Sequence, residues 1–200
     1  MVRSVVWVKP EGAEIAEVEI AAGRLTASGT AIGAGPPPYR LEYELTTGDR
    51  YVTARLLVET YGTDPETGPW RRWLELVNRP EGEWSVSARA EGRVAMPPPG
   101  GDAAALRGAL DCDLGLSPLT NSMPALRLDG DGPAEHLMAW VSVPDLAVVP
   151  SRQTYERVRR DGGHLVFRFS SEGFQEDIEF RDGLVADYPS IGRLAGITGS

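Results

Sequence analysis

Short segments in which apolar and polar residues alternate recur along this chain, and clusters of glycine and proline separate them. Residues 39–46 are a clear example, because Tyr, Leu, Tyr and Leu occupy every second position. The same period of two appears in residues 84–91, 165–169 and 174–180. Successive side chains of a β-strand point to opposite faces, so this period predicts strands with one buried face. Turn signals at such short intervals indicate an all-β fold of many antiparallel strands, as in a barrel, sandwich or roll.

Helical patterns are scarce in the sequence. Asp102 is placed to cap a short helical turn over residues 103–107. Residues 151–160 fit either a strand or a helix, and we favour a strand over residues 154–158.

The proline-rich segment 97–101 is the only candidate linker between domains. Two halves divided there would each expose open sheet edges, which antiparallel sheets avoid. We therefore interpret the segment as a stiff surface loop and expect a single domain over residues 1–200, a length typical of one domain.

The central segment, residues 109–128, is the best place to look for a functional site. Its first half alternates between an apolar side and a polar side. The apolar side is Leu110, Cys112, Leu114 and Leu116, and the polar side is Asp111, Asp113, Gly115 and Ser117. We expect residues 109–116 to form an internal strand whose polar face carries both carboxylates. A loop between two prolines follows, in which Thr120 and Asn121 can hydrogen-bond nearby backbone groups and hold a tight turn.

The same segment resembles the core signature of the putative glycolipid-binding family, a group of bacterial proteins that form a domain of unknown function. The signature, D-x-D-L followed by P-x-T-N-x-x-P, is present here as Asp111–Leu114 and Pro118–Pro124. Further family segments follow in the expected order. They are Trp7, residues 41–43 leading to Asp49, residues 144–146, residues 153–155 and residues 183–189. The resemblance implies a long antiparallel sheet coiled into a β-roll or open barrel, and a function like that of lipid carriers.

Two departures from the family pattern matter. Where the family usually has Pro-Ile-Arg-Arg-Leu, this chain has Pro-Ala-Leu-Arg-Leu at residues 124–128, which leaves Arg127 as the single arginine. Tyr51 stands where the family usually has Trp. If the family binds an anionic head group with two adjacent arginines, this chain has only one of them, Arg127.

Composition argues against several classes of partner. The net charge of −9 disfavours nucleic acid and anionic membrane surfaces, because both attract an excess of Lys and Arg. No stretch approaches the roughly 20 apolar residues of a membrane span, and the apolar run near the N-terminus is too short for a signal peptide. We therefore expect a cytoplasmic protein without an integral membrane segment.

Cys112 is the only cysteine, and we interpret it as a small buried hydrophobe.

Metal and cofactor chemistry has little support in the sequence. The two histidines, His136 and His164, fit no HxH or HExxH spacing, and no CxxC pair is present. Residues 129–132, Asp-Gly-Asp-Gly, lack the downstream glutamate of a calcium loop, so we expect a hairpin turn there. We therefore expect neither a metal nor a cofactor.

Asp111 and Asp113 allow several interpretations. Two residues apart on a strand, their Cα atoms are about 6.6 Å apart by strand rise. This overlaps the carboxyl spacing of inverting glycosidases, although side chains on one strand face project in parallel rather than from opposite sides of a bond. They could be solvated acids, acids bound by loop amides or ligand contacts, or less readily a catalytic pair or a Ca²⁺ site.

Two function classes remain open, and a structural or interaction domain without a ligand is a third, plainer class. We favour non-enzymatic binding of an amphiphilic small molecule, a glycolipid or fatty acyl compound, in the concave face of the roll. Tyrosines suit such a ligand, because each offers an apolar ring and one polar group. The alternative is a hydrolase or isomerase that acts on a small hydroxylated or acyl substrate, with Asp111 and Asp113 as acid and base. The candidate ligand-binding residues are Asp111, Asp113, Thr120, Asn121, Arg127, Tyr155 and Tyr188.

Overall fold

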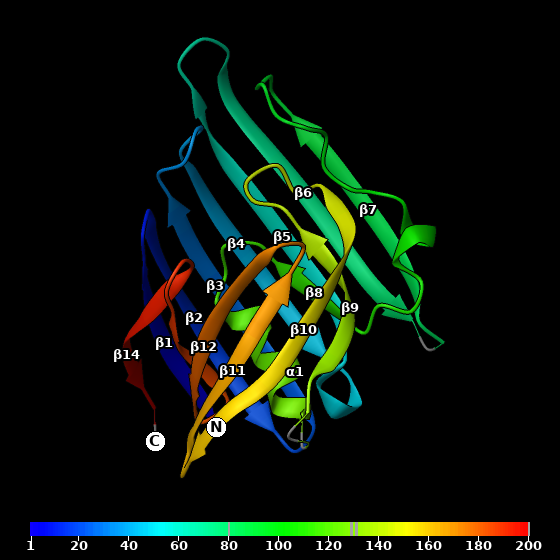
Figure 1. The fold of residues 1–200 in the computed structure, drawn as a ribbon. Coiled ribbons are helices and arrows are strands. Elements are labelled where there is room, and N and C mark those ends of the chain that lie inside the picture. Colours follow the sequence, from blue (N-terminus) through cyan, green and yellow to red (C-terminus); the bar gives the residue numbers. More distant parts are fainter. Residues whose placement is uncertain (80, 129, 131, 200) are drawn as a thin grey trace.

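The structure is a computed structural model that describes residues 1–79, 81–128, 130 and 132–199. Within these residues, fourteen strands form one sheet that is not closed into a barrel, which confirms the expected all-β fold (Figure 1). The strands are β1 (Val2–Lys9), β2 (Gly12–Ala21), β3 (Arg24–Gly33), β4 (Tyr39–Thr47), β5 (Thr53–Asp64), β6 (Gly68–Arg79), β7 (Glu83–Glu91), β8 (Asp111–Leu114), β9 (Ala134–Val141), β10 (Val148–Asp161), β11 (His164–Ser171), β12 (Phe174–Arg181), β13 (Leu184–Tyr188) and β14 (Gly192–Thr198). The helical elements are short: η1 (Asp49–Tyr51), η2 (Ala103–Leu106), η3 (Leu119–Asn121) and α1 (Ser122–Arg127).

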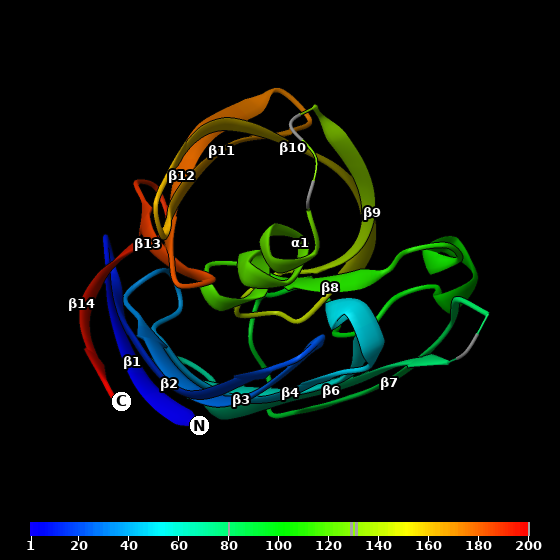
Figure 2. The same cartoon turned by 90° about the horizontal axis from the view of Figure 1, so that it is seen from below.

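The strand order follows the chain closely. It runs β7-β6-β5-β4-β3-β2-β1-β14-β13-β12-β11-β10-β9-β8. Strand β1 pairs with β2 on one side and with β14 on the other, so the N-terminal strand joins the two halves of the sheet. In the view of Figure 2, strands β1–β7 form one layer, strands β9–β13 curve around α1, and β8 lies between them.

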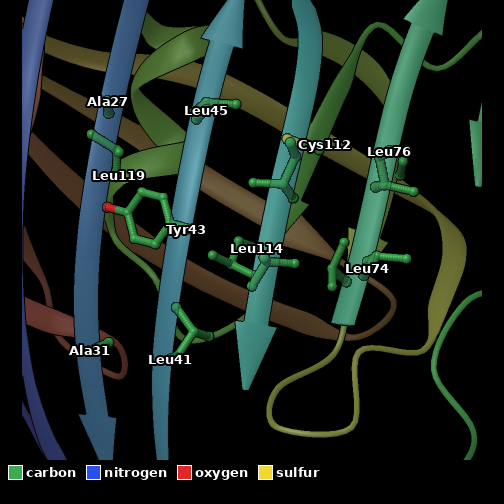
Figure 3. Close-up of a cluster of buried hydrophobic side chains, with 14 of the residues drawn as sticks. Ala27, Ala31, Leu41, Tyr43, Leu45, Leu74, Leu76, Cys112, Leu114 and Leu119 are labelled. Atoms are coloured by element: carbon green, nitrogen blue, oxygen red, sulfur yellow. The ribbon is translucent and has the colours of Figure 1, made fainter. Parts of the chain in front are cut away.

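The main core lies between the β1–β7 layer and the segment from β8 to α1. The alternation predicted for residues 39–46 is present in β4, where every second side chain is buried. Figure 3 shows buried side chains of β3, β4 and β6 beside Cys112, Leu114 and Leu119. Cys112 is fully buried as expected, and burial raises the pKa of its thiol to about 12. A second, aromatic core belongs to β10–β13, with Tyr155, Phe167, Phe169, Phe180 and Tyr188 among its members.

Strand β8 differs from the expected internal strand over residues 109–116. It comprises only Asp111–Leu114, is the last strand in the sheet order, and pairs in parallel with β9. All four of its residues are buried. Thr120 of η3 and Arg127 of α1 contact the two carboxylates, so these short helices cover the polar face of the strand. Leu110 and Leu116, expected on the apolar side, lie outside the strand and are 42% and 43% exposed. The alternation thus indicated a strand correctly, but the polar face is covered by protein.

Two other strands bury less than their sequences predict. Strand β7 buries Trp84 but leaves Ala88 and Ala90 exposed, since it is an edge strand of the sheet. Phe174, at the start of β12, is also exposed.

Two smaller expectations are confirmed, and a third includes residues that the structure does not describe. The turn after Asp102 is present as η2, and the Asp102 carboxylate accepts a hydrogen bond from the Ala104 amide at 2.9 Å. Strand β10 includes residues 154–158, as expected. The turn expected at residues 129–132 includes two residues outside the described part of the chain. No helix among the described residues is long and apolar enough to cross a membrane.

Segment 97–101 is tied to the region that leads into β10. The Gly100 amide donates to the Leu146 carbonyl, and the Gly100 carbonyl accepts from the Val148 amide, both at 2.9 Å. We propose that residues 1–200 form one domain, and we expect limited proteolysis within this segment to release no independently folded half. Size-exclusion chromatography and circular dichroism of the nicked protein measure this. Two separately folded fragments would contradict it.

Candidate functional site

The chain after β8 turns back into the interior of the roll. Gly115 donates its amide hydrogen to the Val141 carbonyl at 2.8 Å, and Leu116 adopts a φ of 61°, which ends the strand. From Pro118 the chain enters η3, which continues directly into α1. Figure 2 shows both helices inside the curve of the sheet, and a polar side chain of each, Thr120 and Arg127, contacts a carboxylate of β8.

Asp111 forms a buried ion pair with Arg127. The Arg127 guanidinium donates from Nη1 to Asp111 Oδ1 at 3.3 Å and from Nη2 to Asp111 Oδ2. The Asp111 side chain is 0% exposed and the Arg127 side chain is 7% exposed. Asp111 Oδ1 also accepts a hydrogen bond from the Thr53 amide at 3.2 Å. The carboxylate therefore joins α1, β8 and the start of β5, and its two oxygens are occupied in a two-pronged contact of the strong, charge-assisted kind.

Asp113 is held by two neutral donors. The Thr120 hydroxyl donates to Asp113 Oδ1 at 3.0 Å, and the side-chain amide of Gln153 donates from Nε2 to Asp113 Oδ2 at 2.6 Å. Burial raises the pKa of the Asp113 carboxyl, and these two hydrogen bonds oppose that rise. Thr120 Oγ1 also accepts from the Leu114 amide at 3.2 Å, which confirms its expected role in holding local backbone.

Asn121 is paired with Tyr155 from the neighbouring part of the sheet. The Tyr155 hydroxyl donates to Asn121 Oδ1 at 2.8 Å, so this amide oxygen serves a side chain rather than the loop backbone. Tyr155 is fully buried, and its ring meets Phe169 edge-on with centroids 5.2 Å apart. Burial, followed by the charge of Asp113, raises the pKa of the Tyr155 hydroxyl well above its usual value, so it keeps its proton and remains a donor.

A pocket of about 560 Å³ opens beside these groups, and we call it the main pocket. It lies between the end of β8, the first half of β10 and the turns that follow β11 and β13. Its apolar lining includes Leu116, Trp140, Val149, Phe169, Phe174 and Ile191, and its polar lining includes Asp113, Asn121, Gln153, Tyr188 and Ser190. The charged side chains among its described lining residues are both acidic, Asp113 and Glu172. The pocket thus combines apolar walls with acceptor-rich polar groups.

The main pocket divides the seven residues predicted from the sequence into two sets. Asp113, Asn121 and Tyr188 line it. The other four lie behind the lining: Thr120 and Tyr155 hold lining residues, and Asp111 pairs with Arg127. The structure adds residues that sequence reasoning missed, chiefly Gln153, Trp140 and Phe169. Gln153 could have been found, because it lies two positions before Tyr155 on the same face of β10 and within a family segment.

The comparisons with known proteins agree with this fold. A family model described as Putative glycolipid-binding matches residues 4–193. The chain belongs to this family. Its membership supports a binding role in general terms.

A solved structure has a fold similar to that of this chain. A crystal structure of a DUF1089 family protein from Pseudomonas aeruginosa is similar to this chain with a TM-score of 0.65 and 24% sequence identity. The match covers 90% of this chain and 91% of that one, and at this identity it shows the fold alone. No curated protein matches the chain.

Proposed function

We propose that this protein binds an amphiphilic small molecule, a glycolipid or a fatty acyl compound, in the main pocket without transforming it. The observation that carries the proposal is the pocket itself, which sets Asp113, Asn121 and Gln153 against walls formed by Trp140 and Phe169 among others. Apolar walls with a few convergent polar groups are the usual composition of a small-molecule site, and about 560 Å³ lies within the usual range of volumes.

The polar lining favours a neutral, hydroxylated head group. A carboxylate has about four acceptor positions, and Asp113 uses two of them for Thr120 and Gln153. It can therefore accept further hydrogen bonds from ligand hydroxyls. A phosphate or carboxylate head would instead be repelled by two acidic residues of the lining, Asp113 and Glu172. A sugar head group fits this lining better than an anionic one.

The apolar walls supply the binding free energy. Burying each methylene of an alkyl chain contributes about 0.8 kcal/mol before ordering costs. A chain of about a dozen carbons therefore reaches micromolar affinity without any strong polar contact. The head-group contacts then decide which amphiphile is accepted.

The enzymatic alternative requires Asp111 and Asp113 to act as an acid and base on one substrate. Asp111 is engaged by Arg127 and by the Thr53 amide, and it does not belong to the described lining of the main pocket. Because a general acid or base must reach the substrate within hydrogen-bond distance, this arrangement favours binding over catalysis.

The test is a titration with two amphiphiles that differ only in the head group, dodecyl glucoside and dodecyl phosphate. We expect saturable binding of the glucoside and weaker binding of the phosphate. Asp113→Asn should weaken glucoside binding by about tenfold, since it replaces a charged acceptor by a neutral one. Asp113→Asn should also reduce the difference in affinity between dodecyl glucoside and dodecyl phosphate.

The matched control is Asp161→Asn, at the exposed far end of β10, which should alter neither affinity. Absence of saturable glucoside binding to the wild-type protein would contradict the proposal. Hydrolysis of a dodecyl glycoside or ester that disappears in Asp113→Asn would move the protein to the enzymatic class.

A further inference from the structure

A second pocket of about 400 Å³ adjoins the main pocket, and we call it the side pocket. It lies between the turn that follows β1, the loop between β3 and β4, and the loop between β9 and β10. Its apolar lining includes Pro10, Pro36, Tyr39, Val143 and Pro144. Leu116, Ser190 and Ile191 line both pockets, so the two hollows meet at these three residues.

The charge of Lys9, which also lines the side pocket, is directed into the protein. Its Nζ lies 3.6 Å from Glu14 Oε2, and the two side chains are 7% and 0% exposed. Glu14 Oε1 in turn accepts hydrogen bonds from the hydroxyls of Ser117 at 2.7 Å and Tyr43 at 2.9 Å. An anion in the side pocket would compete with Glu14 for this ammonium and would also meet Glu11, the other charged lining residue. The chamber is therefore better suited to an apolar group than to an anion.

Leu116 is unusual in both its backbone and its side chain. Its φ of 61° is a left-handed conformation that residues with a Cβ rarely adopt. Its side chain is 43% exposed, although Leu is a residue that folding normally buries. Strained residues of this kind cluster at ligand-binding positions, and this one lines both pockets. A ligand that lies across Leu116 would cover the apolar surface that the fold leaves exposed.

We propose that the side pocket takes a second apolar chain of the same ligand, so that a two-chain glycolipid lies across Leu116 with its head group against Asp113. This rests on the proposed function of the main pocket. Both volumes, about 560 and about 400 Å³, fall within the range of small-molecule sites, so each hollow has room for one chain. The preferred ligand class is therefore a glycoside with two alkyl or acyl chains.

The experiment compares dodecyl glucoside with a didodecyl glycerol glucoside, each delivered from cyclodextrin. The wild-type protein should bind the two-chain ligand about tenfold more tightly or better, since burial of about two further methylene groups is enough for that factor. Gly35→Phe should abolish this advantage and leave dodecyl glucoside binding unchanged. A Cβ at Gly35 would meet only Glu11 Oε2, at 3.7 Å, so the new ring can occupy the side pocket without moving the backbone.

Gly196→Phe on β14 is the matched control, because a Cβ there meets nothing within 4 Å and Gly196 lines neither pocket. It should keep the two-chain advantage, and thermal melts should show that both variants fold. Equal wild-type affinity for the two ligands would overturn the inference while leaving the proposed function in place, and this readout needs no variant. An advantage that persists in folded Gly35→Phe would overturn it as well. If neither glucoside binds, the proposed function itself fails, and the inference with it.

Discussion

Arg127→Met is expected to lower the free energy of unfolding by about 3–5 kcal/mol, because it leaves a buried carboxylate without its partner. Asp111 is fully buried, and the Arg127 guanidinium contacts both of its oxygens. Methionine keeps much of the apolar stem of arginine but cannot replace the charge. Urea denaturation followed by tryptophan fluorescence measures the loss.

The matched control is Arg168→Met on β11. Arg168 also contacts an aspartate, Asp177, at 3.1 Å, but its side chain is 43% exposed and that of Asp177 is 49% exposed. Exposed ion pairs contribute little because water screens them. We therefore expect an unchanged urea midpoint for this variant. Equal effects of the two substitutions would show that the Asp111–Arg127 pair is not the connection between α1 and β8 that the structure indicates.

The strands could be predicted from the sequence wherever one face packs on a core and the other meets water. Strand β4 meets that condition and shows the full alternation. Strand β8 does not, because η3 and α1 cover its polar face, and a six-residue helix that contains Pro124 leaves no recognisable helical period. The exposure of Leu110 and Leu116 likewise depends on where the strand ends, which is set by tertiary packing rather than by the local pattern.

The candidate site was only partly predictable, because part of its lining also depends on tertiary packing rather than on a local pattern. Asp113 and Asn121 lie within the central segment, so the local motif and the family resemblance pointed to them. Trp140 faces the site because β8 pairs in parallel with β9, in a register that sets Asp113 opposite Trp140. A parallel pair of strands outside an α/β fold carries no sequence signal of its own, so neither this register nor the contribution of Phe169 could be read from the chain.

Tyr155→Ala is the second substitution with a large expected effect, a loss of about 3–5 kcal/mol of unfolding free energy. The ring is fully buried in the aromatic core between β10 and β13, where it packs edge-on against Phe167 and Phe169. Removing it leaves a cavity and also removes the donor to Asn121. The conservative variant Tyr155→Phe separates these two contributions, because it keeps the ring and removes only the hydroxyl.

Tyr155→Phe should cost about 1–3 kcal/mol, since Asn121 Oδ1 then loses a buried donor. Tyr61→Phe is the control, because the Tyr61 hydroxyl also donates to a side-chain oxygen, Glu42 Oε1 at 3.0 Å, but at the surface, where water can replace it. It should leave the urea midpoint unchanged. If Tyr155→Phe behaved like Tyr61→Phe, then the hydroxyl would not be what holds Asn121, and the shape of the polar end of the main pocket would have to come from α1 and Gln153 instead.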